Sequence, residues 1–458
     1  MSYQKNTKIH SETAAIYCRD ENRVDWHSKA LWTLREKRDR AASSIPEWED
    51  LRQLGHELKM HTLSNLGQYL EEFEKNCIEN GIQVHWAKDA KEHNEIIHSI
   101  LAKHNVKKLV KSKSMLTEEC HMNPYLESKG IEVIDTDLGE RICQLAKQPP
   151  AHIVVPAINL KKEEVGELFH EKIGTEKGAS DPTYLTRAAR QHLREEFLSA
   201  DAALTGVNIG IADKGAVVVC TNEGNADMGV NLPKLQLHSM GIDKMVPNLD
   251  CAAVLLRMLA RNATGQPSTT YTSMYRGPKK GGEMHIVLVD NGRTKMLQDK
   301  ILAESLKCIR CGGCLNTCPV YRRSGGHSYN YIIPGPIGIA VGSTRDETNS
   351  IPWACTLCAS CSNVCPTKVP LDKVIHHHRR LKAEAHQLPY GKNTYMPIVG
   401  KVMGSEALLN GSMAIARTAL RILPGSLLKP FSGVWGKYRE LPVAPASSFD
   451  TWYKKNRK

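Results

Sequence analysis

Eight cysteines between residues 308 and 365 repeat one spacing twice, and this repeat is the most specific chemical signal in the chain. In each copy three cysteines stand at every third position, and a fourth follows four residues later, directly before a proline. The two copies are Cys308-Cys311-Cys314-Cys318-Pro319 and Cys355-Cys358-Cys361-Cys365-Pro366. Bacterial ferredoxins with two 4Fe–4S clusters use this spacing, and the fourth cysteine of each motif ligates the other cluster.

The spacing therefore predicts two 4Fe–4S clusters with crossed ligands. Cluster one is expected to take Cys308, Cys311, Cys314 and Cys365, and cluster two Cys355, Cys358, Cys361 and Cys318. Zinc is the alternative, but a zinc ribbon uses two Cys-x2-Cys pairs and explains neither the third cysteine nor the repeated Cys-Pro. All-cysteine clusters leave no iron open to a substrate, so the pattern indicates electron transfer. The apolar segment 329–342 between the motifs either shields the clusters from water or is an ordinary structural loop.

Upstream of the cysteines, the hydrophobic pattern predicts an α/β fold with a largely parallel sheet. Short apolar runs alternate with amphipathic stretches, as in strand–helix–strand units. The predicted strands are 82–86, 106–110, 131–134, 151–157, 209–220 and 284–289, and the predicted helices are 91–103, 117–129 and one that begins at Pro182 with Asp181 as its N-cap. Residues 1–60 are polar and are expected to form peripheral helices.

These patterns divide the 458 residues into four parts. They are a helical N-terminal extension (1–60), an α/β domain (61–300), a mostly helical ferredoxin-like domain with two clusters (301–390) and a basic C-terminal tail (391–458). From Pro366 to the end there are 16 Lys and Arg against 5 Asp and Glu, so this region holds nearly all of the net charge of +12. We expect the tail to dock on an acidic partner or an anionic membrane surface.

The sequence also predicts the binding partners and the cellular location of the protein. The chain has no nucleic-acid-binding motif, and the basic tail is not interleaved with aromatic residues, so nucleic acid is not an expected partner. No stretch approaches the ~20 consecutive apolar residues of a membrane span. The first ten residues are polar. We therefore expect a cytoplasmic protein that can associate peripherally with the inner face of the membrane.

A weaker candidate site lies where polar residues follow predicted strands. Lys111 and Lys113 follow strand 106–110 and precede a helix, and Glu223 follows strand 209–220. Ligands of parallel α/β sheets bind at such carboxyl ends, and this set could hold a carboxylate or phosphate. Turn formation explains the same residues without a ligand. The run His376–His378 is interpreted as a solvated helix end, and no motif for NAD, FAD or ATP is present.

Several stretches together resemble the lactate utilization protein B family of iron–sulfur subunits. They are VKSKSMLTEE (110–119), DTDLGERI (135–142), TGVNIGIADKGAVVVCTNEGNADMG (205–229), GPKKGGEMHIVLVDNGR (277–293), GGHSYNYIIPGPIG (325–338) and both cysteine motifs. The resemblance spans residues 20–450, nearly the whole chain.

The resemblance implies an α/β LUD domain, related to sugar-phosphate isomerase and CoA-transferase folds, followed by the ferredoxin-like module. It also implies a role in oxidising L-lactate to pyruvate together with a cysteine-rich lactate utilization subunit and a second LUD-domain subunit. It names no catalytic residue. We expect an electron-transfer subunit of this complex, an oxidoreductase component that does not depend on NAD. The alternatives are a subunit of another hydroxy-acid or aldehyde dehydrogenase complex, and a non-enzymatic redox-sensing scaffold.

Overall fold

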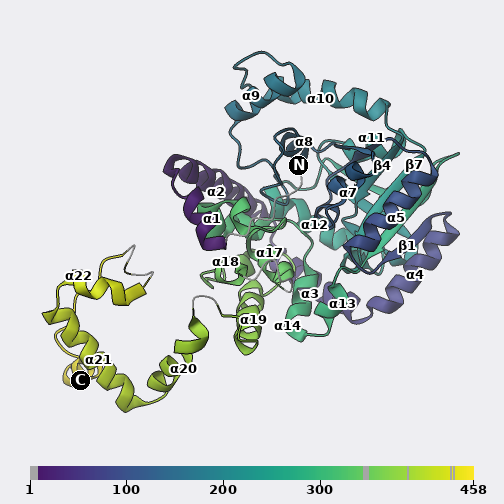
Figure 1. Ribbon diagram of the computed structural model, residues 1–458. Coiled ribbons are helices and arrows are strands. Elements are labelled where there is room, and N and C mark those ends of the chain that lie inside the picture. The colour runs from purple at the N-terminus through teal and green to yellow at the C-terminus, as the bar shows by residue number, and fades with distance from the viewer. Residues whose placement is uncertain (1–8, 344–349, 389–390, 434–435, 437–438, 458) are drawn as a thin grey trace. The chain divides into compact units, whose positions relative to one another are not determined.

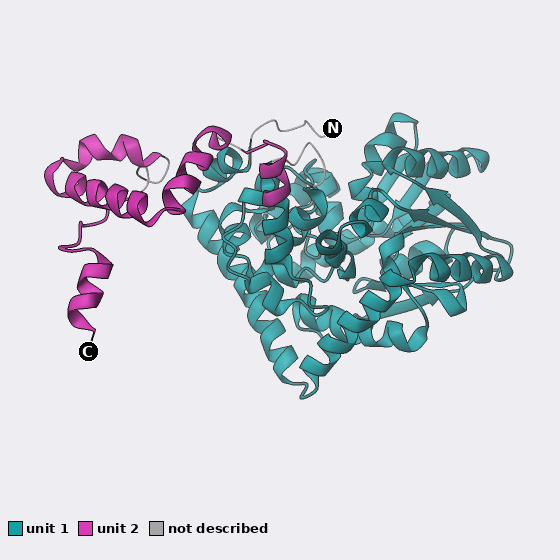
Figure 2. Ribbon diagram, turned by 90° about the horizontal axis from the view of Figure 1, so that it is seen from below, with its two compact units in different colours: residues 1–379 teal, residues 380–458 magenta. Residues whose placement is uncertain are grey.

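The computed structural model describes residues 9–343, 350–388, 391–433, 436 and 439–457. The chain forms two compact units, residues 1–379 and 380–458 (Figure 2). The first unit contains the sheets and the eight motif cysteines, and the second is helical. Whether residues 1–60, 61–300 and 301–390 are separate domains stays a prediction.

A parallel sheet forms one side of the first unit, opposite α1 (His10–Tyr17) and α2 (Glu21–Ser43) (Figure 1). Among the described residues six strands build it in the order β1-β10-β7-β4-β2-β3, and each neighbouring pair is parallel. The strands are β1 (Gln83–Ala87), β2 (Lys108–Lys111), β3 (Glu132–Asp135), β4 (Ala202–Gly206), β7 (Leu235–Gly241) and β10 (Glu283–Val289). Because all six run in the same direction, their carboxyl ends share one edge of the sheet. The α/β fold predicted from the sequence is confirmed.

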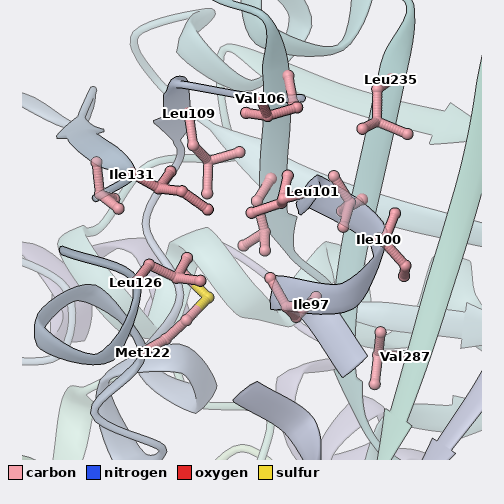
Figure 3. Close-up of a cluster of buried hydrophobic side chains, with 14 of the residues drawn as sticks. Ile97, Ile100, Leu101, Val106, Leu109, Met122, Leu126, Ile131, Leu235 and Val287 are labelled. Carbon is pink, nitrogen blue, oxygen red and sulfur yellow. The ribbon is translucent and has the colours of Figure 1, made fainter. Parts of the chain in front are cut away.

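Helix α5 (Ala90–Lys103) covers one face of this sheet. Its buried side chains include Ile97 and Leu101, which recur at helical spacing and pack with Leu109 and Val287 from the strands (Figure 3). Burying one such aliphatic side chain stabilises the fold by about 1.5–3 kcal/mol. This apolar layer holds the strands in register, and thus sets where their carboxyl ends lie.

A second, mixed sheet packs within the same unit. Its order among the described residues is β8-β5-β6-β9. Its strands are β5 (Ile209–Ile211), β6 (Ala216–Thr221), β8 (Met245–Val246) and β9 (Tyr271–Tyr275). The predicted strand 209–220 is therefore two antiparallel strands, β5 and β6. Gly215 turns the chain between them with φ +54°, and a Cβ there would lie 2.4 Å from the backbone of Asn76.

The N-terminal helices are not peripheral, which corrects the expectation from the sequence. Helix α2 (Glu21–Ser43) packs on α12 (Leu249–Thr264) and on the short helix α15 (Gly313–Thr317) of the cysteine region. Leu31 in α2 is fully buried. The polar composition was misleading because several arginines of α2 and of α3 (Trp48–Ser64) hydrogen-bond to the cysteine loops instead of to solvent.

The cysteine region consists of short helices that alternate with loops, as the sequence predicts. The helices are α15, α16 (Pro319–Ser324), α17 (Gly335–Gly342), α18 (Ser360–Val364) and α19 (Leu371–Glu384). Pro319 starts α16 directly after a motif cysteine, where the missing N–H of proline costs nothing.

Two more predicted elements differ from the structure. Residues 151–157 form bends and turns, not a strand. Ala151, His152 and Ile153 are buried against the cysteine region, and the carbonyl of Ala151 accepts a hydrogen bond from Tyr321 Oη at 2.6 Å. The predicted helix 117–129 is two helices, α6 (Met115–Glu119) and α7 (Met122–Ser128), because His121 between them has a φ of +52°.

The second unit consists of short helices with many exposed apolar side chains. Its main helices are α20 (Lys392–Met403), α21 (Glu406–Ile422), α22 (Gly425–Leu428) and α24 (Phe449–Asn456). Met413, Ile415 and Phe431 are exposed by 63%, 72% and 89%. In the described part of the chain, no helix is both long and apolar enough to cross a membrane.

Candidate iron–sulfur centre and adjoining cavity

The structure gathers the eight motif cysteines into two groups. Cys308, Cys311, Cys314 and Cys365 line one small cavity, although Cys365 belongs to the second motif. Burial raises the pKa of the Cys314 thiol well above its usual range, and the neighbouring Cys308 and Cys311 raise it further. Four thiols from both motifs thus meet at one place, which is the arrangement that cluster one requires.

The second group is complementary. Burial raises the pKa of Cys318 to about 11, and the thiols of Cys355 and Cys358 add to this shift. Burial likewise raises the pKa of Cys361, with Cys318 and Cys355 contributing. Cys318 of the first motif therefore lies with three cysteines of the second. The grouping agrees with the crossed assignment, while ligation of each cluster by these residues stays a prediction.

The loops around the sulfurs fit iron–sulfur clusters. Backbone N–H groups donate to four of the thiols: Arg310 N to Cys308 Sγ (3.3 Å), Leu357 N to Cys355 Sγ (3.3 Å), Val369 N to Cys365 Sγ (3.3 Å) and Tyr321 N to Cys318 Sγ (3.5 Å). Arg310 and Leu357 occupy equivalent positions in the two motifs, and both have positive φ, +61° and +57°. Hydrogen bonds to the sulfurs stabilise thiolates and help to set cluster potentials.

Residues far away in the sequence support the first cysteine group. Asn262 of α12 donates through Nδ2 to Cys311 Sγ at 3.2 Å, and its Oδ1 accepts from Arg38 Nε of α2 at 2.8 Å. Arg52 of α3 donates through Nε to the carbonyl of Cys365 at 3.0 Å. These contacts orient the ligands from outside the motifs, in the way that partners of metal ligands usually do.

The segment 329–342 packs onto the cysteine region. Tyr329 and Ile333 are fully buried, and Ile337 of α17 lines the cavity of the first cysteine group. Of the two interpretations of this segment, the structure favours the one in which it keeps water away from a cluster.

A larger cavity, of about 260 Å³, lies at the carboxyl ends of the parallel strands and extends to Cys311. Residues that follow β2, β4 and β6 line one side, and Ile309, Arg310 and Cys311 line another. Segment 151–157 contributes to the wall, and its Val154 lies so close to Gly312 that a Cβ there would be 2.9 Å away. The α/β layer and the first cysteine group thus share one cavity.

The structure separates the residues of the predicted anion site. Lys113 and Glu223 line the large cavity, whereas Lys111 does not. The Lys111 side chain is fully buried, and its Nζ lies 2.6 Å from Glu118 and 2.8 Å from Asp135. Burial lowers the pKa of Lys111, but the surrounding carboxylates more than compensate and raise it well above its ordinary value. Lys111 is thus committed to carboxylates of the chain and is not available to a ligand.

The two remaining predicted residues lie beside Asp137. Lys113 Nζ bonds to Asp137 Oδ2 at 2.7 Å. The protein around the cavity partly desolvates Glu223, although the side chain is open to the cavity, and this raises its pKa. The nearby Asp137 raises that pKa further, and Lys113 opposes the shift. A carboxyl group with a raised pKa in a cavity is suited to proton transfer.

Comparison with known proteins decides the family. Residues 70–296 match the LUD domain, and residues 304–369 match a 4Fe-4S dicluster domain. The chain is 39% identical over 450 residues to lactate utilization protein B of Oceanobacillus iheyensis, covering 94% of this chain and 93% of that protein. The chain belongs to the lactate utilization protein B family. It is an iron–sulfur electron transport protein of that family, and the predicted iron–sulfur cofactors are confirmed.

One further relative and one solved structure were also found. An Escherichia coli (strain K12) protein named "Uncharacterized electron transport protein YkgF" is 38% identical over 434 residues, with 92% of this chain and 91% of that protein covered. A crystal structure of a DUF162 family protein from Deinococcus radiodurans aligns with 49% of this chain and 98% of that one, at 13% identity and a TM-score of 0.26.

The interpretation of the histidine run 376–378 as a solvated helix end holds for His376, which is exposed, and is wrong for the other two. His377 and His378 lie inside α19 and are exposed by only 5% and 2%. His377 Nε2 lies 2.7 Å from Asp299 Oδ2, and His378 Nε2 lies 2.9 Å from the carbonyl of Ala340 in α17. These two contacts link α19 to Asp299 and to α17, because the side of α19 that carries the two histidines is buried.

Two functional residues, Arg310 and Asn262, were missed by reasoning from the sequence. Arg310 stands inside the first motif, so its position next to the ligands could have been noticed. Asn262 carried no signal, because only packing brings α12 beneath the cysteine loop.

Proposed function

We propose that this chain is the iron–sulfur electron-transfer subunit of a complex that oxidises L-lactate to pyruvate. Family membership supports this proposal, since the relatives named lactate utilization protein B match over nearly the full chain. The observation that carries it is the cavity at the carboxyl ends of the strands, which extends to Cys311 of the first cysteine group.

The chemistry of the reaction fits this arrangement. Oxidation of a 2-hydroxy acid to a 2-keto acid releases two electrons and two protons. When bound, two 4Fe–4S clusters supply one-electron transfer sites. The chain's own residues contribute burial, hydrogen bonds to the sulfurs and an apolar cover around Ile337, all of which control solvent access and potential.

The test is anaerobic. The chain is isolated with its natural partners, L-lactate is added, and the iron–sulfur absorbance and the EPR signal of reduced clusters are recorded. We expect bleaching and a signal from reduced clusters. Replacing Cys311 by Ala in a complex that still assembles should abolish lactate-dependent electron flow. Clusters that dithionite reduces but L-lactate does not would contradict the proposal.

The alternatives are resolved by the same material. Reduction by another hydroxy acid or an aldehyde, and not by L-lactate, would assign the chain to a different dehydrogenase complex. Clusters that respond to no substrate or acceptor would indicate a redox-sensing scaffold. Neither alternative has a structural observation in its favour over L-lactate oxidation.

We further propose that the second unit docks the chain onto the other subunits of this complex. These are a cysteine-rich lactate utilization subunit and a second LUD-domain subunit, and the complex works in the cytoplasm. The support is chemical: the C-terminal region is strongly basic, and α21 exposes apolar side chains such as Met413 and Ile415. An anionic membrane surface is the competing contact, and vesicle flotation distinguishes it from subunit binding.

A further inference from the structure

Arg310 is distinguished from the other cations in the large cavity. Within the described residues four cationic side chains line it, Lys113, Lys244, Arg293 and Arg310. The first three each hydrogen-bond to a carboxylate of the chain, at 2.5–2.7 Å. Arg310 has only an ion pair with Glu119 at 3.6 Å, and its buried Nη1 has no hydrogen-bond partner among the described residues. Buried polar groups are normally hydrogen-bonded, so this guanidinium nitrogen is expected to donate to an acceptor of another molecule.

Arg310 shares two carboxylates with other cations of the cavity wall. Lys244, Arg293 and Arg310 lie in one wall of the cavity, with Asp243 and Glu119 as their carboxylate partners. Burial disfavours the ionised form of Asp243, but Lys244 and Arg293 overcome this and lower its pKa well below the usual value. Cys308, a predicted ligand of cluster one, is a further source of negative charge near Arg310. The case for an anion at this wall therefore rests on the unpartnered Nη1 of Arg310, since neither carboxylate lies within hydrogen-bonding distance of that guanidinium.

A different wall offers neutral polar groups and a carboxyl group. Asn225 is exposed by only 4%, and its Oδ1 has no hydrogen-bond partner in the described part of the chain. Thr221 Oγ1, buried near the end of β6, also lacks a partner there. Glu223 lies between these residues in the sequence and lines the same cavity. A ligand that reaches from Arg310 to this wall needs an anionic end and a hydrogen-bonding end.

We propose that the cavity binds a small hydroxycarboxylate, with its carboxylate on Arg310 and its hydroxyl at the wall formed by Thr221, Glu223 and Asn225. The volume of about 260 Å³ is below that of most pockets for drug-sized ligands, about 300–1,000 Å³, and suits a small acid. Because Arg310 directly precedes Cys311, the bound acid lies beside cluster one. The inference depends on the proposed function only for which acid is bound.

Binding is measured by anaerobic calorimetry on the cluster-loaded full chain, with L-lactate and propionate as probes. Propionate keeps the carboxylate and lacks the hydroxyl. Arg310→Gln is expected to weaken both probes at least about tenfold, since a hydrogen bond between charged groups is lost. Arg310→Lys should restore part of the affinity. Glu223→Gln, which lies outside both cysteine motifs, should weaken L-lactate more than propionate.

Arg323→Gln is the matched control. Arg323 also belongs to the cysteine region, but it is 59% exposed and pairs with Asp25 away from the cavity. The Arg323→Gln variant should bind both probes with the same affinity as the parent chain. Iron content and absorbance confirm that each variant keeps its clusters.

Several results would overturn the inference. They are no binding of either probe to the parent, parental affinity in Arg310→Gln, and equal loss for both probes in Glu223→Gln. A changed EPR spectrum of Arg310→Gln at unchanged affinity would show that Arg310 serves the cluster alone. If the probes bind in a way that depends on Arg310, but L-lactate does not reduce the clusters in the complex, the proposed function is refuted and the anion site stands. If neither probe binds, while L-lactate reduces the clusters of the complex and Arg310→Gln leaves this reduction intact, the anion site is refuted and the proposed function stands.

Discussion

The crossed arrangement of cysteines makes a prediction that two double variants can decide. Cys314 and Cys365 come from different motifs but line the same cavity, whereas Cys314 and Cys318 come from one motif and lie in different groups. Cys314→Ala/Cys365→Ala therefore removes two ligands from cluster one and none from cluster two. Cys314→Ala/Cys318→Ala removes one ligand from each cluster.

The expected iron content follows from this count. The parent should hold about eight iron atoms per chain, four in each cluster. The variant that lacks Cys314 and Cys365 should retain about four, because two remaining thiolates cannot hold cluster one while cluster two keeps its full set. In the variant that lacks Cys314 and Cys318, neither cluster keeps four cysteines, so both should be damaged.

Iron analysis and EPR under anaerobic conditions measure both outcomes. The reduced parent should show interaction between two clusters, and the Cys314/Cys365 variant the signal of one isolated 4Fe–4S cluster. Cys18→Ala is the control, since Cys18 is exposed and lies outside both motifs. If the Cys314/Cys318 variant kept one intact cluster and the Cys314/Cys365 variant kept none, each motif would hold its own cluster and the reasoning would be refuted.

Three further predictions concern the surroundings of the clusters, the sheet and the second unit. Asn262→Leu removes the hydrogen bond to Cys311 Sγ, so a redox titration should show a more negative potential for one cluster only; an unchanged potential would contradict a tuning role. Lys111→Met leaves buried carboxylates without their cation, at a cost of about 3–5 kcal/mol near neutral pH. Because burial already raises the pKa of Asp135 and Glu140, the folded-state pKa values of these two carboxyl groups would rise further. The loss in melting temperature should therefore grow from pH 5.5 to pH 8 and fade toward the unfolded pKa of about 4, and a loss independent of pH would oppose this account. Deleting residues 400–458 should weaken co-purification of the partner subunits while the iron content stays at the parental value, and undiminished co-purification would exclude docking through this region.

Much of the fold follows from local sequence patterns. The alternation of strands and helices in residues 82–134 is visible because each buried strand is a short apolar run, and each covering helix repeats its apolar residues at helical spacing. Asp181 and Pro182 mark the start of α10 (Pro182–Leu198) for an equally local reason, since Asp181 accepts the N–H of Tyr184. Segment 151–157 shows the limit: its apolar residues are buried by the cysteine region, and burial alone does not distinguish a strand from a packed loop.

The sequence by itself determined the chemistry of the cofactors, because three ligands of each cluster lie within one short loop and the cysteine spacing states them directly. Only the tertiary structure decided what surrounds them. It placed three carboxylates around the buried Lys111, brought Asn262 to Cys311, and extended the cavity at the carboxyl ends of the strands to Arg310. These relations join residues 7 to 200 positions apart through the packing of α2, α12 and the sheet. No local pattern records them, since packing depends on the shapes of both surfaces in contact.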